Sequence, residues 1–262
     1  MGQSFRRLQI LDIARHERLV EVDDLARRFG VTSQTIRRDL GELADEGRLE
    51  RVHGGAMMPP EGTNARYPDR AAINQEAKER IGQACAAQIP DSSSVMLGIG
   101  TTTEAVARAL AEHKDLTVVT NNLNIADILT PNESFEVIVA GGTMRAMDRA
   151  LIGELTSEFL DAFKVEHAVI GTSALDLAGD FLDFDLHEVR VSQRIIATAR
   201  KTILVTDGSK LGRAAPIKTA SLRDIGAVFT DTLPDELLLK CDEWDTAVFQ
   251  SGAGSPVYEA DD

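Results

Sequence analysis

The apolar residues of the first 55 positions recur at three- and four-residue steps, a pattern that predicts three short helices. Gly30 closes the second predicted helix, and Gly47 closes the third, which we expect at residues 32–46. The apolar positions of the three helices are, in chain order, Phe5, Leu8, Ile10, Leu11 and Ile13, then Val22, Leu25, Ala26 and Phe29, then Ile36, Leu40 and Leu43. This pattern indicates a small helical domain.

The third predicted helix carries hydrogen-bonding and cationic side chains off its apolar stripe, within its first two turns. Thr32 precedes it, and a threonine hydroxyl at that position accepts a hydrogen bond from a backbone N–H of the first turn. A helix in the major groove of DNA contacts base edges and phosphates through its N-terminal turns, so the composition favours DNA binding. A solvent-exposed helix face with ordinary arginines would also contain such residues. The candidate DNA-binding residues of the helix are Ser33, Gln34, Thr35, Arg37 and Arg38.

The residues after the third helix predict a hairpin, with a short strand followed by a turn. Leu49 and Val52 flank two charged residues, and His-Gly-Gly at residues 53–55 indicates a turn or the tip of a wing. In a winged helix-turn-helix the wing lies along the DNA backbone, so Arg51 and His53 are expected to support the contact. Residues 1–56 are therefore predicted to form a winged helix-turn-helix DNA-binding domain.

The pattern changes after residue 56. Residues 57–70 hold three prolines, one glycine and no apolar period, which predicts a linker. Residues 71–250 alternate short apolar runs with amphipathic segments, which predicts an α/β domain with a parallel sheet covered by helices. Residues 251–262 show no period and are expected to be disordered. The predicted strands are residues 94–97, 116–120, 135–140, 168–171, 202–206, 227–230 and 246–249, and the predicted helices are residues 71–88, 102–113, 122–129, 153–162 and 186–200.

Polar and glycine-rich segments follow four of the predicted strands. In an open α/β sheet, ligands bind beyond the carboxyl ends of the strands. Glycine lets the backbone approach an anion, and free N–H groups with threonine hydroxyls at a helix start can hold a phosphate. Each segment alone also fits ordinary turn chemistry. The candidate effector-binding residues at these ends are Gly100, Thr101, Thr102, Thr103, Asn121, Asn122, Gly141 and Lys210.

Residues 183–190 place five ionisable side chains where a helix is predicted to begin. Acidic residues at a helix start interact favourably with its dipole, so capping alone accounts for part of the segment. His187 and Arg190 do not fit that interpretation and suggest polar contacts with a ligand. Glu188 and Arg190 are therefore added to the candidate effector-binding residues.

The net charge of −14 is unevenly distributed. Residues 1–56 hold ten arginines, no lysine and ten acidic residues, so all of the excess negative charge follows them. Arginine suits bidentate contact with phosphate or guanine, and an acidic body weakens non-specific binding to DNA. The cysteines, Cys85 and Cys241, indicate neither a disulfide framework nor a zinc site. No stretch reaches the roughly 18 apolar residues of a membrane span, so we expect a cytoplasmic protein without metal or cofactor.

A set of motifs extends from residue 31 to residue 213. They are Thr-Ile-Arg-Arg-Asp-Leu (35–40), His-Gly-Gly-Ala (53–56), Glu-Ala-Lys-Glu-Arg-Ile (76–81), Gly-Thr-Thr (100–102), Thr-Asn-Asn (120–122), Gly-Gly (141–142), Phe-Asp-Leu-His-Glu-Val-Arg (184–190) and Ser-Lys-Leu-Gly-Arg (209–213). Together they resemble the DeoR family of bacterial transcription regulators. The resemblance covers about residues 4–250.

The resemblance implies a C-terminal sensor similar in fold to ribose-5-phosphate isomerase and CoA-transferase-like proteins. It also implies double-stranded operator DNA as a partner and a phosphorylated sugar or polyol as inducer. The segments at 184–190 and 209–213 are most similar to family members that repress genes of glycerol metabolism, with glycerol 3-phosphate as inducer. A homodimer or homotetramer is expected, because paired half-sites need paired DNA-binding domains. Related sequences often carry an aspartate at the position of Gly98 and a lysine at the position of Ser192. These two departures affect one expected contact between the pocket and the inducer.

Two other functions fit parts of the pattern. A sugar-phosphate isomerase would need a pair of acids in the segment that here is Gly-Thr-Ser-Ala-Leu-Asp (171–176), where uncharged residues replace them. Without a placed base, catalysis loses a factor of roughly 10² to 10⁴, so no enzyme activity is expected, although Asp176, Asp183 or Glu188 could substitute. A regulator, including an activator, that senses a different phosphorylated sugar would carry the same motifs.

Overall fold

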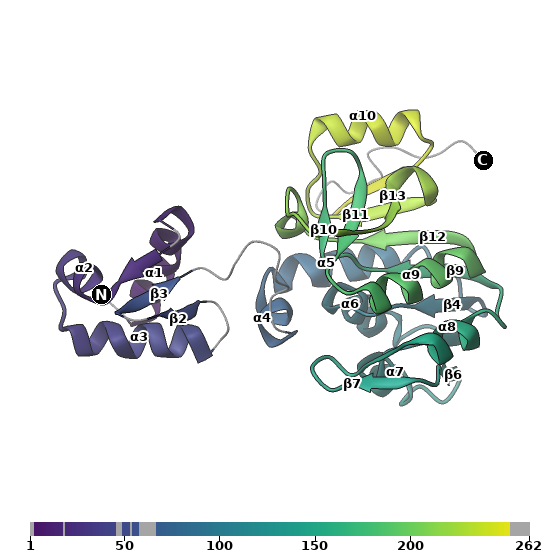
Figure 1. The fold of residues 1–262 in the computed structure, drawn as a ribbon. Coiled ribbons are helices and arrows are strands. Elements are labelled where there is room, and N and C mark those ends of the chain that lie inside the picture. Colours follow the sequence, from purple (N-terminus) through teal and green to yellow (C-terminus); the bar gives the residue numbers. More distant parts are fainter. Residues whose placement is uncertain (1–2, 18, 46–48, 53, 58–66, 252–262) are drawn as a thin grey trace. The chain divides into compact units, whose positions relative to one another are not determined.

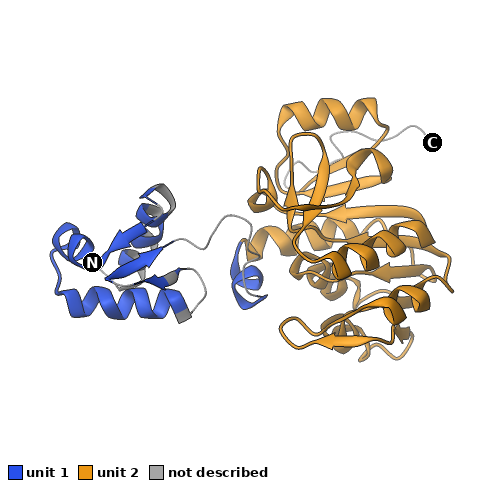
Figure 2. Ribbon diagram, viewed as in Figure 1, with its two compact units in different colours: residues 1–73 blue, residues 74–262 orange. Residues whose placement is uncertain are grey.

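The computed structural model describes residues 3–17, 19–45, 49–52, 54–57 and 67–251. The chain divides into two compact units, residues 1–73 and residues 74–262 (Figure 2). Each unit has its own apolar core, so each is described separately.

The N-terminal unit is a winged helix-turn-helix. Its core is formed by the apolar stripes of the helices, with Ile10, Leu25, Ile36 and Leu43 fully buried. The three strands form an antiparallel sheet in the order β1-β3-β2 (Figure 1). The elements are α1 (Gln3–Glu17), β1 (Leu19–Glu21), α2 (Val22–Phe29), α3 (Ser33–Asp45), β2 (Glu50–Val52) and β3 (Gly55–Met57).

Local chemistry sets the boundaries of α2 and α3. Gly30 follows α2 with a φ of 64°, a left-handed conformation that glycine adopts without a steric penalty. The Thr32 hydroxyl accepts a hydrogen bond from Thr35 N (3.2 Å), as predicted for a cap. Gly47, predicted to close α3, lies outside the described residues.

Strand β1 was not predicted, whereas β3 pairs with β2 as the second strand of the predicted hairpin. Val20 pairs with Ala56, so the chain before α2 is drawn into the same sheet as the wing. Gly55, predicted as part of a turn, begins β3, and a Cβ there would collide with the carbonyl oxygen of Val20. The prediction missed β1 because three residues are too few to show an alternating pattern.

Secondary structure also occupies both ends of the predicted linker at residues 57–70. Met57 is the last residue of β3, and α4 (Tyr67–Ala72) precedes α5 (Gln75–Ala86). The helix predicted at residues 71–88 is therefore broken at Asn74, which has a φ of 53°. Asparagine tolerates this left-handed conformation better than most residues.

The C-terminal unit contains a seven-stranded parallel sheet in the order β15-β14-β12-β9-β4-β5-β6 (Figure 1). Each strand matches one of the seven predicted strands, so the predicted fold class is confirmed. The strands are β4 (Ser94–Leu97), β5 (Thr117–Thr120), β6 (Glu136–Val139), β9 (Val165–Ile170), β12 (Ala199–Val205), β14 (Ala227–Thr230) and β15 (Ala247–Gln250).

Alternating side chains of the sheet build a core on each face. In β4, Val95 and Leu97 pack with α5, α6 (Thr101–Leu110) and α7 (Leu123–Leu129). Met96, between them, packs on the other face with α8 (Glu154–Leu160), α9 (Leu186–Thr198) and α10 (Asp235–Glu243). This two-sided burial explains why the strands are continuous apolar runs in the sequence.

Short elements and one helix of this unit were not predicted. Strands β7 (Thr143–Arg145) and β8 (Ala150–Ile152) form a hairpin, and β10 (Ala174–Leu175), β11 (Asp180–Asp183) and β13 (Ile217–Ser221) form a small antiparallel sheet. Helix α10 was missed because its buried apolar stripe is narrow, with Leu237 and Cys241 inside. Cys85 and Cys241 are both buried and unbridged.

Helices α5 and α6 pack closely enough to exclude a side chain at Gly82. A Cβ at this position would lie 2.6 Å from the backbone carbon of Ala105. We expect Gly82→Ala to lower the free energy of unfolding, because overpacking costs about 1–3 kcal/mol and outweighs the helix-propensity gain of about 1 kcal/mol. Urea unfolding measures the change. Gln83→Ala, exposed on the same helix, is the control, and equal stability of the two variants would contradict the expectation.

Candidate functional site

Helix α3 presents a polar face to solvent. Its exposed side chains follow the spacing of one helix face and are Gln34, Arg37 and Arg38. The opposite face is buried and carries Ile36, Leu40 and Leu43. The predicted apolar stripe is confirmed, and two arginines of the same face are positioned for contact with an anionic surface.

The predicted DNA-binding residues differ in their contacts. Ser33 Oγ donates to Asp23 Oδ1 of α2 (3.0 Å), and the hydroxyls of Thr35 and Thr32 lie 2.9 Å apart. Arg38 pairs with Glu42 (3.0 Å). These residues are therefore partly engaged within the unit.

The wing contacts α3 through Arg51. Its Nη2 donates to the backbone oxygen of Arg37 (2.9 Å), which joins β2 to the middle of α3. The side chain of Arg37 makes no hydrogen bond or ion pair with any residue that the structure describes. His53, the other predicted wing residue, lies outside the described residues.

A buried ion pair joins α1 to α3. Arg6 Nε lies 2.6 Å from Asp39 Oδ2, and the exposed fraction of the Asp39 side chain is 1%. The hydrogen bond to Asp39 raises the pKa of Arg6. The sequence analysis did not single out Asp39, because the partner is 33 residues away and nothing local indicates the pair. It fixes the orientation of α3 from its buried side.

In the C-terminal unit, the segment after β4 forms the N-terminus of α6. Gly100 is the residue before the helix and has a φ of 140°, which favours glycine. It has no side chain to cap the helix, so no capping side chain covers the first N–H groups. Thr102 and Thr103 are buried, and Thr103 Oγ1 donates to Gly100 O (2.6 Å). The turn has the geometry of an anion-binding helix start.

Loops from neighbouring strands surround this turn. Strand β9 pairs with β4, and a Cβ at Gly100 would lie 4.0 Å from the Cα of Gly171, which follows β9. Strand β12 pairs with the other side of β9, so the loop that carries Lys210 lies two strands, roughly 10 Å, from the Gly100 turn. The parallel sheet therefore brings these predicted residues to one edge.

Asn121 and Asn122 lie at the end of β5, each 1% exposed. Asn121 Nδ2 donates to Leu151 O (3.0 Å), and Asn122 Oδ1 accepts from Asn124 N (2.7 Å). The other amide atoms, Asn121 Oδ1 and Asn122 Nδ2, are buried without a hydrogen-bond partner in the protein. Buried polar atoms are rarely left unpaired, so these two atoms mark a place for a polar ligand.

The loop after β12 contains a buried charged pair. Asp207 is fully buried, Lys210 is 9% exposed, and Asn74 Nδ2 donates to Asp207 Oδ1 (2.8 Å). Burial by itself would raise the pKa of Asp207, but hydrogen bonds from Ser209 and Asn74 and the charge of Lys210 outweigh it, so this pKa lies below its ordinary value.

Lys78 is a buried cation that the sequence analysis did not single out. It lies on α5, is 3% exposed, and its backbone N donates to Asn74 O (3.0 Å). Asn74 contacts the Asp207 loop on one side, while Gly82, one turn beyond Lys78, contacts α6 on the other. Lys78 therefore lies between the two predicted phosphate-binding segments. Its burial could not be seen from the sequence, because three other charged residues (Glu76, Glu79 and Arg80) lie in the same part of the helix.

Glu188 and Arg190 lie on different faces of α9. Glu188 is buried and pairs with Arg145 (2.8 Å), whereas Arg190 and His187 are exposed. Asp185 caps the helix by accepting from His187 N (2.8 Å). The structure thus brings Glu188 to a charged cluster and leaves Arg190 at the surface.

Arg145, on the unpredicted β7–β8 hairpin, is the centre of that cluster. It also binds Asp148 through two hydrogen bonds (2.9 and 2.6 Å) and Asp185 (3.0 Å). Burial by itself would lower the pKa of Arg145, but its bonds to Asp148 and Glu188 raise it. Gly141, which precedes the hairpin, is exposed, and its carbonyl accepts from Thr156 Oγ1 (2.8 Å).

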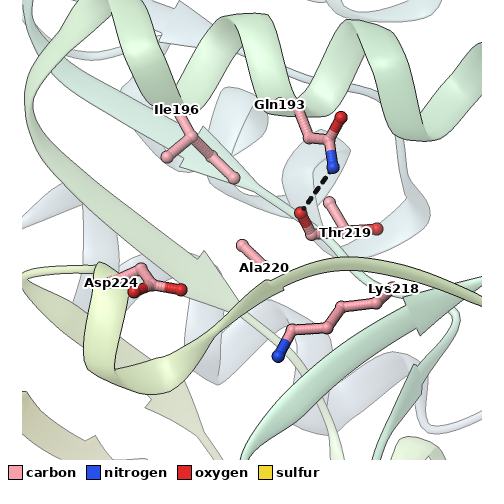
Figure 3. A pocket seen from close by; sticks show the side chains of 6 residues that line it. All are labelled: Gln193, Ile196, Lys218, Thr219, Ala220 and Asp224. Atoms are coloured by element: carbon pink, nitrogen blue, oxygen red, sulfur yellow. Dashed lines mark hydrogen bonds between the residues drawn. The ribbon is translucent and has the colours of Figure 1, made fainter.

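A surface pocket of about 480 Å³ lies elsewhere, between α9 and β13 (Figure 3). Its polar side chains are engaged: Gln193 Nε2 donates to Thr219 O (3.1 Å), Lys218 pairs with Asp180 (2.7 Å), and Asp224 accepts from Ser221 N (3.0 Å). The strand ends, with their unpaired amide atoms, are the better candidate for a polar ligand.

Of the two positions at which related sequences often carry another residue, Gly98 directly follows β4. Gly98 N donates to Val169 O (2.9 Å), and a Cβ there would be 3.4 Å from the nearest side-chain atom of Ile195. Ser192 is half-buried on α9.

A winged helix-turn-helix joined to a parallel-sheet α/β domain is the architecture of a ligand-responsive DNA-binding regulator. The DeoR-like helix-turn-helix domain matches residues 6–61, and the DeoR C terminal sensor domain matches residues 73–232. The chain belongs to the DeoR family of transcriptional regulators, as the motifs predicted.

Relatives of similar length support this assignment. The chain is 43% identical to the glycerol-3-phosphate regulon repressor of Escherichia coli (strain K12), covering 89% of this chain and 93% of that protein. It is 41% identical to the protein of the same name from Haemophilus influenzae, covering 91% and 93%. It is 36% identical to the transcriptional repressor CsqR of Escherichia coli (strain K12), covering 88% of each.

Solved structures share part of the fold. Ribose 5-phosphate isomerase A from Methanocaldococcus jannaschii is 14% identical with a TM-score of 0.39, covering 53% of this chain and 55% of that chain. The delta subunit of eIF2B from Chaetomium thermophilum is 15% identical with a TM-score of 0.47, covering 62% and 58%. Likeness at this level assigns no substrate.

The described residues also bear on membrane insertion and metal binding. None of their helices is both long and apolar enough to cross a membrane. Within the same residues, no group of three or more His, Cys, Asp or Glu side chains is placed to hold a metal ion.

The depressed pKa of Asp207 predicts a pH dependence of stability. Because the folded pKa is below the ordinary 3.8, the carboxylate stabilises the fold above that pH, and the stabilisation is lost as the pH falls through the folded value. The free energy of unfolding of the wild type should therefore exceed that of Asp207→Asn. This difference should be larger at neutral pH than at about pH 3. Urea unfolding across the range measures this difference. Asp242→Asn, which removes an exposed carboxylate, is the control, and a constant difference would contradict the prediction.

Proposed function

We propose that this protein represses genes of glycerol and glycerol 3-phosphate metabolism and is released from operator DNA by a phosphorylated polyol, with glycerol 3-phosphate as the first candidate. The observation that carries the proposal is its 43% identity, over 89% of the chain, to a glycerol-3-phosphate regulon repressor. Operator DNA and phosphorylated metabolites are both found in the cytoplasm, where the protein acts.

Helix α3 contacts the major groove in this proposal. Gln34, Arg37 and Arg38 are exposed on one face, with the N-terminal turns available to base edges and phosphates. Ser33 and Thr35 support the start of the helix, and Arg51, with His53, contacts the backbone from the wing. Paired half-sites about 34 Å apart require two such units, so the protein acts as a dimer or tetramer.

The phosphate of the effector binds at the N-terminus of α6, where backbone N–H groups and the hydroxyls of Thr101, Thr102 and Thr103 meet it after the Gly100 turn. Lys78 and Lys210 supply the positive charge, because both are buried beside this turn or beside the neighbouring loop. The remaining effector contacts come from Asn121 and Asn122, whose buried amide atoms lack protein partners. Gly141, Glu188 and Arg190 are weaker candidates, since Glu188 is already paired and the other two are exposed.

Release from DNA follows from linkage. If DNA and effector favour different arrangements of the oligomer, each weakens the other by the same factor, typically 5- to 150-fold. A ligand with equal affinity for both arrangements would change nothing.

Catalysis is not part of the proposed function. Asp176, the acid nearest to the position of an isomerase base, accepts hydrogen bonds from the backbone N of Ala178 and Asp180 (both 2.9 Å). These hydrogen bonds hold the turn before β11, so the geometry of Asp176 supports a structural role.

Arg37 is the sharpest test of the DNA contact. We expect Arg37→Ala to weaken operator binding. If Arg37 contacts a base, its loss should cost about 1–3 kcal/mol of binding free energy; if it contacts a phosphate, its loss should reduce the slope of log affinity against log salt concentration by about 1. Fluorescence anisotropy of labelled operator at several salt concentrations separates the two. Arg108→Ala, which removes an exposed arginine of the C-terminal unit, is the control. Unchanged affinity of the Arg37 variant would remove α3 from the proposed interface.

Lys210 tests the effector site. In the wild type, glycerol 3-phosphate should weaken operator binding by a factor within the 5- to 150-fold range. Lys210→Ala should bind operator normally and need a higher concentration of glycerol 3-phosphate for release. Lys218→Ala, in the separate surface pocket, is the matched control and should respond as the wild type does.

Two results would count against this assignment. If glycerol 3-phosphate leaves wild-type operator binding unchanged, it is not the inducer. A thermal-shift panel of phosphorylated three- to six-carbon metabolites then identifies the effector, since a ligand at 100 times its dissociation constant adds about 2.7 kcal/mol of stability. If Lys210→Ala abolishes DNA binding, Lys210 is structural.

A further inference from the structure

The cluster around Arg145 holds more negative than positive charge. One guanidinium contacts three carboxylates, those of Asp148, Asp185 and Glu188, at 2.6–3.0 Å. Asp148 and Glu188 are nearly buried, with side-chain exposures of 5% and 9%. The four side chains carry a formal charge of −2, and the burial of Asp148 and Glu188 weakens the screening of their charges by water.

This cluster adjoins the strand end where the unpaired amide atoms lie. Leu151 N, in the hairpin, donates to Asn121 O (2.7 Å), and Ala150 forms a bridge with Asn122. Ala150 N also approaches Asp148 Oδ1 (3.4 Å). Asn121 Oδ1 and Asn122 Nδ2, buried and without protein partners, are an independent sign of a ligand beside the acids.

The opposite side of the same edge carries two buried lysines, together with the buried carboxylate of Asp207. Lys210 follows β12, which lies on one side of β4, whereas the Asn121 segment and the hairpin follow β5 and β6 on the other side. Lys78 is tied to the β12 side through Asn74 and Asp207. The N-terminus of α6, which follows β4, lies between the two sides. The edge therefore carries buried charges of both signs, with the Arg145 cluster on the side of β5 and β6.

We propose that the Arg145 cluster is the specificity filter of the effector site: it admits a monophosphate whose far end carries hydroxyl groups and rejects one whose far end carries a second anion. This rests on the proposed function, because it assumes that the phosphate binds at the α6 end. Hydroxyl groups at the far end donate to carboxylates and pair with the amide atoms of Asn121 and Asn122. A carboxylate there would be repelled by the net charge of −2.

Glycerol 3-phosphate and 3-phosphoglycerate form a matched pair of probes, because a terminal CH₂OH in the first is a carboxylate in the second. The measured quantity is the concentration of each that gives half-maximal thermal stabilisation, with inorganic phosphate as a third probe. At an effective dielectric constant of about 20, the wild type should need at least about 100-fold more 3-phosphoglycerate than glycerol 3-phosphate.

Removing one negative charge from the cluster should narrow that ratio. Glu188→Gln is the direct variant, and we expect its ratio to fall by about tenfold. Asp185→Asn is a second variant that preserves the start of α9, since asparagine caps a helix as well as aspartate does. The control is Glu112→Gln, which removes an exposed carboxylate just after the C-terminal end of α6. This variant should keep the wild-type ratio.

The outcomes separate this inference from the proposed function. A ratio that narrows in Glu188→Gln and Asp185→Asn but not in Glu112→Gln supports the filter. Equal stabilisation of the wild type by both three-carbon probes, or an unchanged ratio in both cluster variants, overturns the filter alone. If neither probe nor inorganic phosphate stabilises the wild type, the phosphate site itself is wrong and the filter falls with it.

Discussion

Parallel pairing of the strands is the constraint on which the candidate effector site depends. Because all seven strands run in one direction, the loops after β4, β5, β6, β9 and β12 emerge at the same edge. Segments more than 100 residues apart in the sequence, such as the Gly100 turn and the Lys210 loop, become neighbours. The close approach of α5 to α6 at Gly82 then brings the N-terminal turn of α5, with Lys78, to the same edge.

Buried charge is used differently in the two units. In the N-terminal unit, the Arg6–Asp39 pair lies behind α3 and leaves its solvent face to other side chains. In the C-terminal unit, Lys78, Asp207, Lys210 and Glu188 are buried at the edge where a ligand would arrive. Desolvation of a charged group is costly unless it is paired, so a site that retains several such groups is preorganised for a charged partner.

Much of the fold was predictable because it depends on local patterns. The seven sheet strands are short apolar runs, and the boundaries of α2 and α3 follow from Gly30 and Thr32. Long-range contacts were not predictable. Arg145 stands in a hairpin whose sequence shows no regular apolar period, and its partners Asp185 and Glu188 lie 40 and 43 residues away. The motif residues of the Gly100 turn could be found, whereas Lys78 and Arg145 needed the packing of the chain to distinguish them from surface charges.

The backbone crowding at Gly55 bears on what the family signature means. This glycine belongs to the His-Gly-Gly-Ala motif, and its lack of a side chain is required by the carbonyl of Val20 in the neighbouring strand. Part of the motif thus records how tightly the wing is folded, independently of any base sequence. Regulators that share it can bind unrelated operators, and differences in operator preference must be sought among the exposed residues of α3 instead.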